Sequence, residues 1–154
     1  MIEPLHHLNG MEIAIRRARV EDAEAIARLS GQLGYPATAE QIAERVRDLM
    51  GREDSAVLVA TEPGGEVVGW LHAAKLFTLT DEPSAHMVGL VVDDRFRGQR
   101  VGRRLLAEAE GWARDEGCGK IVVRSRLGRE RAHAFYENLG YEHFKTQRAF
   151  RRRL

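Results

Sequence analysis

Positions 92–106 read Val92-Asp93-Asp94-Arg95-Phe96-Arg97-Gly98-Gln99-Arg100-Val101-Gly102-Arg103-Arg104-Leu105-Leu106. An apolar run ends at Val92, and the spacing of Val101 and Leu105 predicts that a helix begins near Gln99. The first N–H groups of a helix have no partner within it, and the helix dipole is positive there, so such a start attracts anions. Two glycines and five arginines surround this start. The stretch therefore predicts a site for a ligand with phosphate groups, most naturally a cofactor that carries a pyrophosphate.

Two common phosphate-binding patterns are absent from this stretch. The phosphate loop of nucleotide hydrolases needs Lys-Ser or Lys-Thr after its last glycine, but Gly102 is followed by Arg103. The three spaced glycines of dinucleotide-binding proteins are missing as well. On pattern alone, an arginine-rich helix start that simply faces solvent remains the alternative interpretation.

The rest of the chain alternates between strand-like and helix-like periods. Glycine or proline closes several of the predicted elements, and Thr38 is suited to cap a helix. This order predicts an α/β (α+β) single domain over residues 11–154 with a mixed sheet, since hairpins and crossover helices both occur. Residues 1–10 are expected to form a flexible extension. Strands are predicted at 12–18, 56–60, 66–79, 86–92 and 120–123, with one or two more within 141–154, and helices at 23–33, 39–50, 99–116 and 129–139.

The composition excludes several classes of protein. The 154 residues carry a formal net charge of +1, which gives no global reason to expect nucleic acid or an acidic membrane as a partner. No apolar run approaches the ~20 residues that a membrane-spanning helix needs. The single cysteine, Cys118, rules out an internal disulfide and a cysteine-based zinc site. The start of the chain does not resemble a secretory signal, so a cytoplasmic location is expected.

Two stretches together resemble the motifs of the GNAT superfamily of acetyl-CoA-dependent N-acetyltransferases. Residues 92–106 resemble its acetyl-CoA motif, with Arg97 at the first motif position, Gly102 at the last, and Arg100 where a glycine is usual. Residues 129–141 are similar to its later motif, with Arg129 in place of the usual asparagine. The motifs occur in the family's order with one predicted strand between them.

This resemblance implies a GNAT-like fold, in which the fourth and fifth strands of a central mixed sheet splay apart and helices flank the sheet. It implies transfer of an acetyl group from acetyl-CoA to a primary amine of a small molecule or protein, by direct attack in a ternary complex. No metal, nucleic acid or membrane is expected to take part, and a homodimer is left open. A non-catalytic acyl-CoA-binding or regulatory module on the same fold is the alternative. The residues expected to bind the cofactor are Leu90, Val91, Val92, Arg97, Gly98, Gln99, Arg100, Val101, Gly102 and Arg103.

The resemblance also suggests how the reaction is assisted. Gly89 lies inside a predicted strand and suggests a bulge or a close approach by other atoms. The Leu90 N–H is the expected donor to the oxyanion, and the Tyr136 hydroxyl is the expected proton donor to the departing thiolate. The acceptor amine is expected to meet residues 21–50 and 76–85, which lie outside both motifs. The general base stays open between a water chain and four side chains, Asp81, Glu82, His86 and His72.

Overall fold

The computed structural model describes residues 12–98 and 100–154. The predicted N-terminal extension, residues 1–10, lies outside the described residues, and so does Gln99, one of the predicted cofactor-binding residues. The chain forms two compact units, of which the first ends at Arg124 and the second is Ser125–Leu154.

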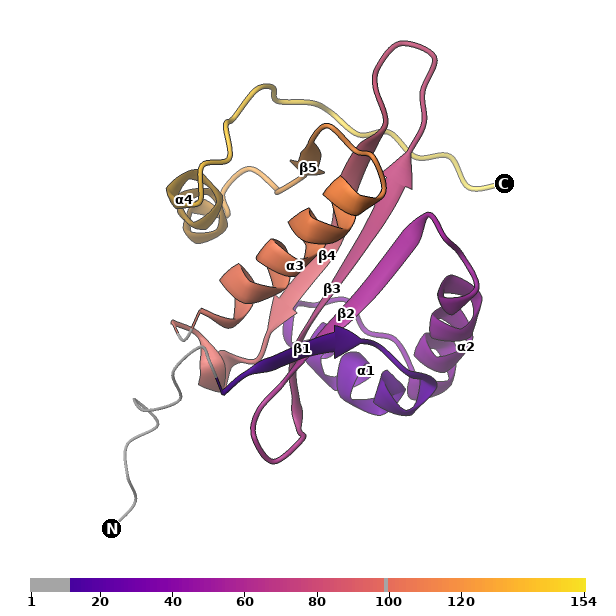
Figure 1. Ribbon diagram of the computed structural model, residues 1–154, viewed down its shortest axis with the longest axis vertical. Helices are drawn as coiled ribbons and strands as arrows, with labels where there is room; N and C mark the ends of the chain where they lie inside the picture. Colours follow the sequence, from indigo (N-terminus) through magenta and orange to yellow (C-terminus); the bar gives the residue numbers. More distant parts are fainter. Residues whose placement is uncertain (1–11, 99) are drawn as a thin grey trace. The chain divides into compact units, whose positions relative to one another are not determined.

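The first unit contains a five-stranded mixed sheet in the order β1-β2-β3-β4-β5 (Figure 1). The first four strands pair antiparallel with their neighbours, and β5 pairs parallel to β4. A mixed sheet with both kinds of pairing confirms the prediction from element order. The strands are β1 Ala14–Arg17, β2 Ser55–Thr61, β3 Val67–Leu76, β4 Ser84–Val92 and β5 Ile121–Val123.

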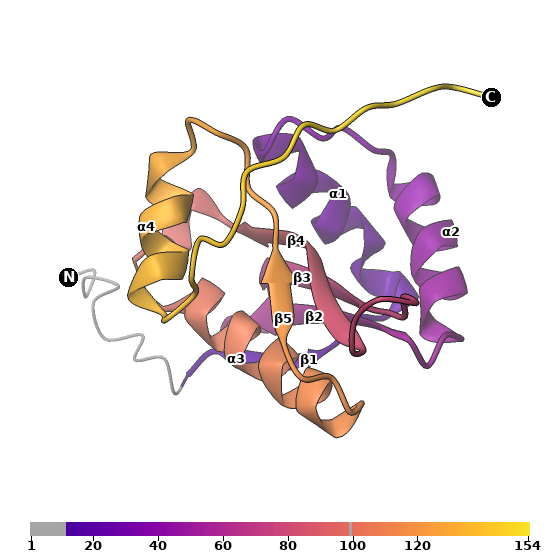
Figure 2. The same ribbon diagram turned by 90° about the horizontal axis from the view of Figure 1, so that it is seen from above.

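Helices cover both faces of this sheet. The helices α1 (Ala23–Gln32) and α2 (Ala39–Met50) lie on one face, and α3 (Val101–Asp115) lies on the other (Figure 2). Two short 3-10 helices, Val20–Asp22 and Asp94–Phe96, precede α1 and α3. Thr38 caps α2 as expected, because its hydroxyl accepts from the Gln41 N–H while the Gln41 side chain accepts from the Thr38 N–H.

The hydrophobic core is divided by the sheet. On the α1 and α2 face, Val59 and Val91 pack with Ile26, Leu29 and Val46. On the α3 face, a Cβ added to Gly69 would meet the Leu105 and Val101 side chains at 3.2 and 3.3 Å. The sheet and α3 therefore pack in close contact along β3, which holds the start of α3 beside the end of β4.

The fourth and fifth strands separate after a short pairing. β5 pairs with β4 only at Ala85, His86 and Met87. The pairing of β4 with β3 shifts register between Met87 and Gly89, which makes Val88 the extra residue of a β-bulge. The splayed fourth and fifth strands that the resemblance predicted are thus part of the first unit.

The second unit contains the helix α4, Glu130–Asn138. Gly140, with φ of 88°, follows the helix, and the Tyr141 N–H donates to the Tyr136 carbonyl. The strands predicted within 141–154 are absent, so that part of the prediction is wrong. Residues 142–154 are exposed along their whole length, and no described residue forms a ladder with them. A strand needs such a ladder, whatever the propensity of its residues.

Candidate active site

The second half of β4 directs backbone groups away from its neighbour β3. The Asp93 N–H donates to the Val68 carbonyl over 2.8 Å. In an antiparallel ladder, residues that bond to the partner strand alternate with residues that do not. The register pairs Val91 with Trp70, and each of these residues lies two positions along its strand from the Asp93–Val68 hydrogen bond. Leu90 and Val92 therefore turn their N–H and C=O groups toward the side of β4 on which β5 has already separated.

The bulge at Val88 determines which residues face this open edge. Before the bulge, the Ala85 N–H donates to the Lys120 carbonyl over 3.0 Å, so odd-numbered residues face β5. The extra residue reverses the alternation, and even-numbered residues face the same side after it. Val88 itself is 63% exposed.

Gly89, which sequence reasoning connected with the bulge, has a different role beside it. A Cβ built on Gly89 would lie 2.7 and 2.8 Å from two carbons of the Trp70 ring. These are impossible contacts without movement of the ring, so Gly89 is needed for the close approach of Trp70. Of the two predictions made for Gly89, a bulge or a close approach by other atoms, the close approach is the one that holds at this residue.

The connection from β4 to α3 turns through two left-handed residues. Gly98 has φ of 79°, and Arg100 has φ of 63° and ψ of 15°. Arg100 is the one non-glycine residue with positive φ in the described part of the chain. A side chain in this conformation costs roughly 1 kcal/mol, which a glycine would avoid. Such strain marks positions where the backbone path itself is needed.

The start of α3 presents free N–H groups. The Arg104 N–H makes the first bond of the helix, to the Arg100 carbonyl over 3.0 Å. The N–H groups of Val101, Gly102 and Arg103 precede it and therefore have no acceptor within the helix. Arg100 and Arg103 are exposed and make no ion pair with any residue that the structure describes. Among the described residues, which exclude Gln99, these three N–H groups have no backbone acceptor outside the helix either, so they and the two cationic side chains are available to an anion.

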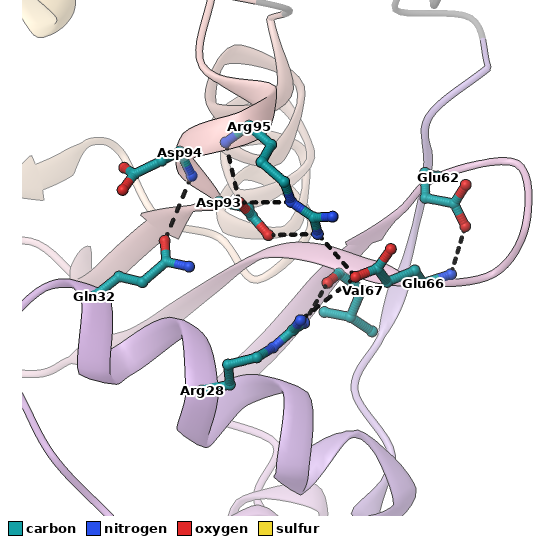
Figure 3. A network of polar contacts seen from close by, with 8 residues as sticks. All are labelled: Arg28, Gln32, Glu62, Glu66, Val67, Asp93, Asp94 and Arg95. Atoms are coloured by element: carbon teal, nitrogen blue, oxygen red, sulfur yellow. Dashed lines mark hydrogen bonds and ion pairs between the residues drawn. The ribbon is translucent and has the colours of Figure 1, made fainter.

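The other three arginines of the predicted cluster are engaged within the fold. Arg95 makes ion pairs with Asp93 and Glu66 at 2.9 and 2.8 Å (Figure 3). A guanidinium hydrogen bond from Arg95 holds the pKa of the buried Asp93 carboxyl below its usual range. Arg104 donates to the Ile13 carbonyl, and Arg97 pairs with Asp94 at 2.9 Å.

Two of the four side chains considered as general base are engaged by cationic partners. Both carboxylate oxygens of Asp81 accept, one from Lys120 and the other from the Glu82 N–H. The Lys120 hydrogen bond lowers the pKa of Asp81. His86 lies 2.7 Å from Arg124 through Nδ1, and a guanidinium only donates, so Nδ1 is the acceptor. Burial, followed by the charges of Arg124 and Lys120, lowers the pKa of His86.

Glu82 and His72 keep unused groups. Glu82 is exposed and has no ion pair with any described residue. His72 lies on β3 opposite Gly89, and burial lowers its pKa, so the imidazole is neutral at neutral pH. Its Nε2 is buried and has no hydrogen-bond partner in the described part of the chain. A neutral imidazole in this state has a nitrogen left for a water or a ligand.

Tyr136 lies on α4 in the second unit, where it is half-buried. Its ring makes edge contacts with Phe135 and Tyr141, with centroids 5.1 and 5.8 Å away. Burial raises the pKa of its phenol above the ordinary 10.0, and the charge of Arg129 acts in the opposite direction. The hydroxyl is therefore protonated throughout the neutral range, as a proton donor requires.

The described residues contain no group of three or more metal-ligating side chains, and none of the helices within 12–98 and 100–154 is long and apolar enough to cross a membrane.

Comparisons with known proteins bear on this site. The sequence profile of the acetyltransferase (GNAT) family matches residues 20–141. The chain is 31% identical over 132 residues to an aminoglycoside N(6')-acetyltransferase type 1 of Stenotrophomonas maltophilia, covering 83% of this chain and 85% of that protein. It is 31% identical over 146 residues to an aminoalkylphosphonate N-acetyltransferase of Salmonella typhimurium, covering 88% and 90%.

A solved structure has the same fold. It is AAC(6')-Iy in complex with the bisubstrate analogue CoA-S-monomethyl-acetylneamine, and it matches with a TM-score of 0.81. The match covers 92% of this chain and 99% of that chain, at 18% identity.

Proposed function

Because this chain belongs to the acetyltransferase (GNAT) family, we propose that it transfers an acetyl group from acetyl-CoA to a primary amine. The named relatives acetylate different amine-bearing compounds, an aminoglycoside and an aminoalkylphosphonate. Acetyl-CoA and the amine bind together in this proposal, and the amine attacks the thioester carbon directly.

The pyrophosphate of acetyl-CoA binds at the start of α3. The residues there suit an anion, because the N–H groups of Val101, Gly102 and Arg103 converge where the helix dipole is positive. A Cβ at Gly98 would meet no atom within 4 Å, and Gly102 carries no side chain. The exposed Arg100 and Arg103 add positive charge, and Arg97 adds its own while paired with Asp94. Gln99 belongs to the same proposed cradle.

The pantetheine arm lies along the open edge of β4. Leu90 and Val92 have backbone groups directed to this edge, where an extended amide-bearing chain can pair with them as an added strand would. Val91 lies between them with its side chain in the core. The Leu90 N–H then donates to the thioester oxygen as negative charge develops on it.

Proton transfers complete the reaction. When the amine nitrogen bonds to the acetyl carbon and the carbon–sulfur bond breaks, the electron pair of that bond stays on sulfur. Tyr136 donates its phenolic proton to this thiolate. The amine loses a proton to a water chain or to a side chain. Of the four considered, Glu82 has no ion pair and His72 has an unpartnered ring nitrogen, Nε2, among the described residues.

The acceptor binds between residues 21–50 and 76–85. Within 76–85, the charge of Asp81 is already balanced by Lys120. Glu82 is the carboxylate of that segment that remains free among the described residues.

The single observation that carries the proposal is the open edge of β4 leading directly to the free N–H groups of α3.

The test is a thiol-release assay with acetyl-CoA against a panel of an aminoglycoside, an aminoalkylphosphonate, glucosamine 6-phosphate and a lysine peptide. We expect thiol release with at least one amine, matched by acetylated product in mass spectrometry. No release above the rate without amine, for any acceptor, would contradict the proposal.

One observation favours a second function, a non-catalytic acyl-CoA-binding or regulatory module. Asp81 and His86, two of the side chains considered as base, are engaged by cationic partners. A chain of this kind would bind CoA tightly and release no thiol with any amine. Binding and assay together therefore separate the two functions.

A further inference from the structure

Glu66, Arg95 and Asp93 form a chain of contacts next to the proposed phosphate site (Figure 3). Together with Arg28 we call them the Glu66 network. The Asp93 carboxylate is buried and accepts three hydrogen bonds from Arg95, one from its backbone N–H and two from its guanidinium, at 2.9–3.3 Å. This arrangement fixes both the backbone and the side chain of Arg95 at the end of β4.

Glu66 connects the Asp93–Arg95 pair to two other parts of the first unit. It follows the β2–β3 turn, where its own N–H donates to the Glu62 side chain over 2.7 Å. Its carboxylate accepts from Arg95 at 2.8 Å and from Arg28 of α1 at 3.4 Å. The turn, α1 and the β4–α3 connection therefore meet at one carboxylate.

A second contact joins α1 to the same connection. The Asp94 N–H donates to the Gln32 side chain over 3.4 Å. Phe96, two residues further, is buried. The connection is thus held at Asp93, Arg95 and Phe96, immediately before the left-handed Gly98 and Arg100 that open α3.

We propose that Glu66 and Arg95 are positioning residues for the phosphate-binding start of α3 and are not themselves phosphate ligands. The inference rests on the proposed binding of CoA at that helix start. Its physical basis is the charge around Arg95, whose guanidinium already faces two carboxylates. These two carboxylates already balance the positive charge of Arg95, which makes it a weaker phosphate ligand than the exposed Arg100 and Arg103. The network instead holds the connection so that the N–H groups of 101–103 converge before the ligand arrives.

The network can be tested with CoA as the probe. Glu66→Ala removes the link from Arg95 to the turn and α1 and leaves the Arg95–Asp93 contact in place. We expect CoA to bind roughly three- to tenfold more weakly in calorimetry, as positioning contacts outside the ligand shell typically act. Hydrogen exchange of the N–H groups at 101–105 should become faster in the absence of ligand.

The matched control is Asp54→Ala. Asp54 pairs with Arg52 at 3.2 Å, and its carboxylate is 45% exposed, against 43% for Glu66. It follows α2, and within the described residues its side chain makes no polar contact with the β4–α3 connection. Both variants should melt close to the wild type, because exposed ion pairs contribute little to stability. Only Glu66→Ala should change CoA affinity.

A second variant separates positioning from direct phosphate contact. Arg95→Lys keeps a positive charge beside the buried Asp93 but loses the fork that reaches both carboxylates. If the network acts as a unit, Arg95→Lys and Glu66→Ala weaken CoA binding by similar factors. The double variant then has the same CoA affinity as the single variant with the lower affinity. If Arg95 binds phosphate, Glu66→Ala frees it and CoA binds more tightly.

Unchanged or tighter CoA binding in Glu66→Ala would overturn the inference while leaving the proposed function intact. Absence of CoA binding by the wild type would overturn the proposed function, and the inference with it.

Discussion

Arg100 adopts φ of 63° and ψ of 15° at the residue that begins the proposed phosphate cradle. In the motif that this stretch resembles, a glycine is usual at the position of Arg100. The structure keeps the left-handed path with arginine in place. The folded structure therefore holds the Arg100 backbone in a strained conformation, and the N–H groups that follow keep their direction.

Replacement of Arg100 measures this strain. Arg100→Gly removes the steric cost of the left-handed backbone, whereas Arg100→Val places a β-branched side chain in it. We expect the valine variant to be less stable than the glycine variant by about 1–2 kcal/mol. Urea denaturation of both proteins gives the difference directly. Equal stabilities would mean that residue 100 is not held in the left-handed region.

Tyr136→Phe tests the proposed acid. The change removes the hydroxyl and keeps the ring that packs against Phe135 and Tyr141. Since burial raises the pKa of Tyr136, the wild-type phenol stays protonated above neutral pH, and the loss should persist across that range. We expect kcat to fall about 100- to 10,000-fold with CoA affinity nearly unchanged. Full turnover with the best amine would make Tyr136 a packing residue.

Side chains near the cradle were harder to predict than its backbone. The sequence shows five arginines in a short stretch, and all of them are equally suited to phosphate at that level. The fold directs Arg95 to Glu66, 29 positions away, and Arg104 to the Ile13 carbonyl. These partners come from the β2–β3 turn and the start of β1, so no local pattern identifies them.

At the scale of elements, the bulge in β4 is the feature that the proposed site depends on most. A local glycine suggested an irregularity near residue 89, and the register places the extra residue at Val88. Backbone N–H and C=O groups point alternately to the two sides of a strand, and one extra residue reverses this alternation. If the bulge were placed one residue away, the wrong residues would be assigned to the open edge of β4. Sequence reasoning found the Leu90 N–H through the family resemblance, and the ladder supplies an independent physical reason for its direction.

Gly89→Ala tests the packing beside this bulge. The new methyl would lie 2.7 Å from the Trp70 ring, which packs against the core on the α1 and α2 face. We expect a loss of about 1–3 kcal/mol in the free energy of unfolding, as overpacking typically costs. Gly111→Ala in α3 is the matched control, because a Cβ there meets no atom within 4 Å.

The control should have the opposite sign. Alanine is favoured over glycine within a helix by about 0.5–1 kcal/mol, so Gly111→Ala should raise the stability in the same urea titration. If Gly89→Ala also raises it, the close approach of Trp70 to Gly89 does not exist.

The helices and strands of the first unit follow their sequence periods closely, and the C-terminal segment does not. Thr38 and the glycines after α1 and α4 act locally, and their predicted roles hold in the structure. Residues 141–154 have room for one or two short strands, but a strand exists only where another strand accepts its hydrogen bonds. That condition is set by the tertiary structure and is invisible in a sequence window.

At the scale of the first unit, the mixed sheet brings the two halves of the proposed donor site together. The parallel pairing of β5 ends at Met87, which leaves the rest of β4 with an open edge. The same strand continues through Asp93 into the start of α3, which packs on β3. A ligand with a pyrophosphate and an extended amide-bearing arm therefore meets both features along one path, and acetyl-CoA has this chemistry.

The most direct measurement is a calorimetric titration of CoA into the wild type and into Gly102→Glu. The variant places bulk and negative charge among the free N–H groups of α3. A glutamate in the first turn of a helix is itself favourable by about 0.3–1 kcal/mol, so the fold should survive. We expect saturable CoA binding by the wild type, none by the variant at comparable concentrations, and none of NAD by either. Equal CoA affinity in the two proteins, or no binding by the wild type, would contradict a phosphate site at the start of α3.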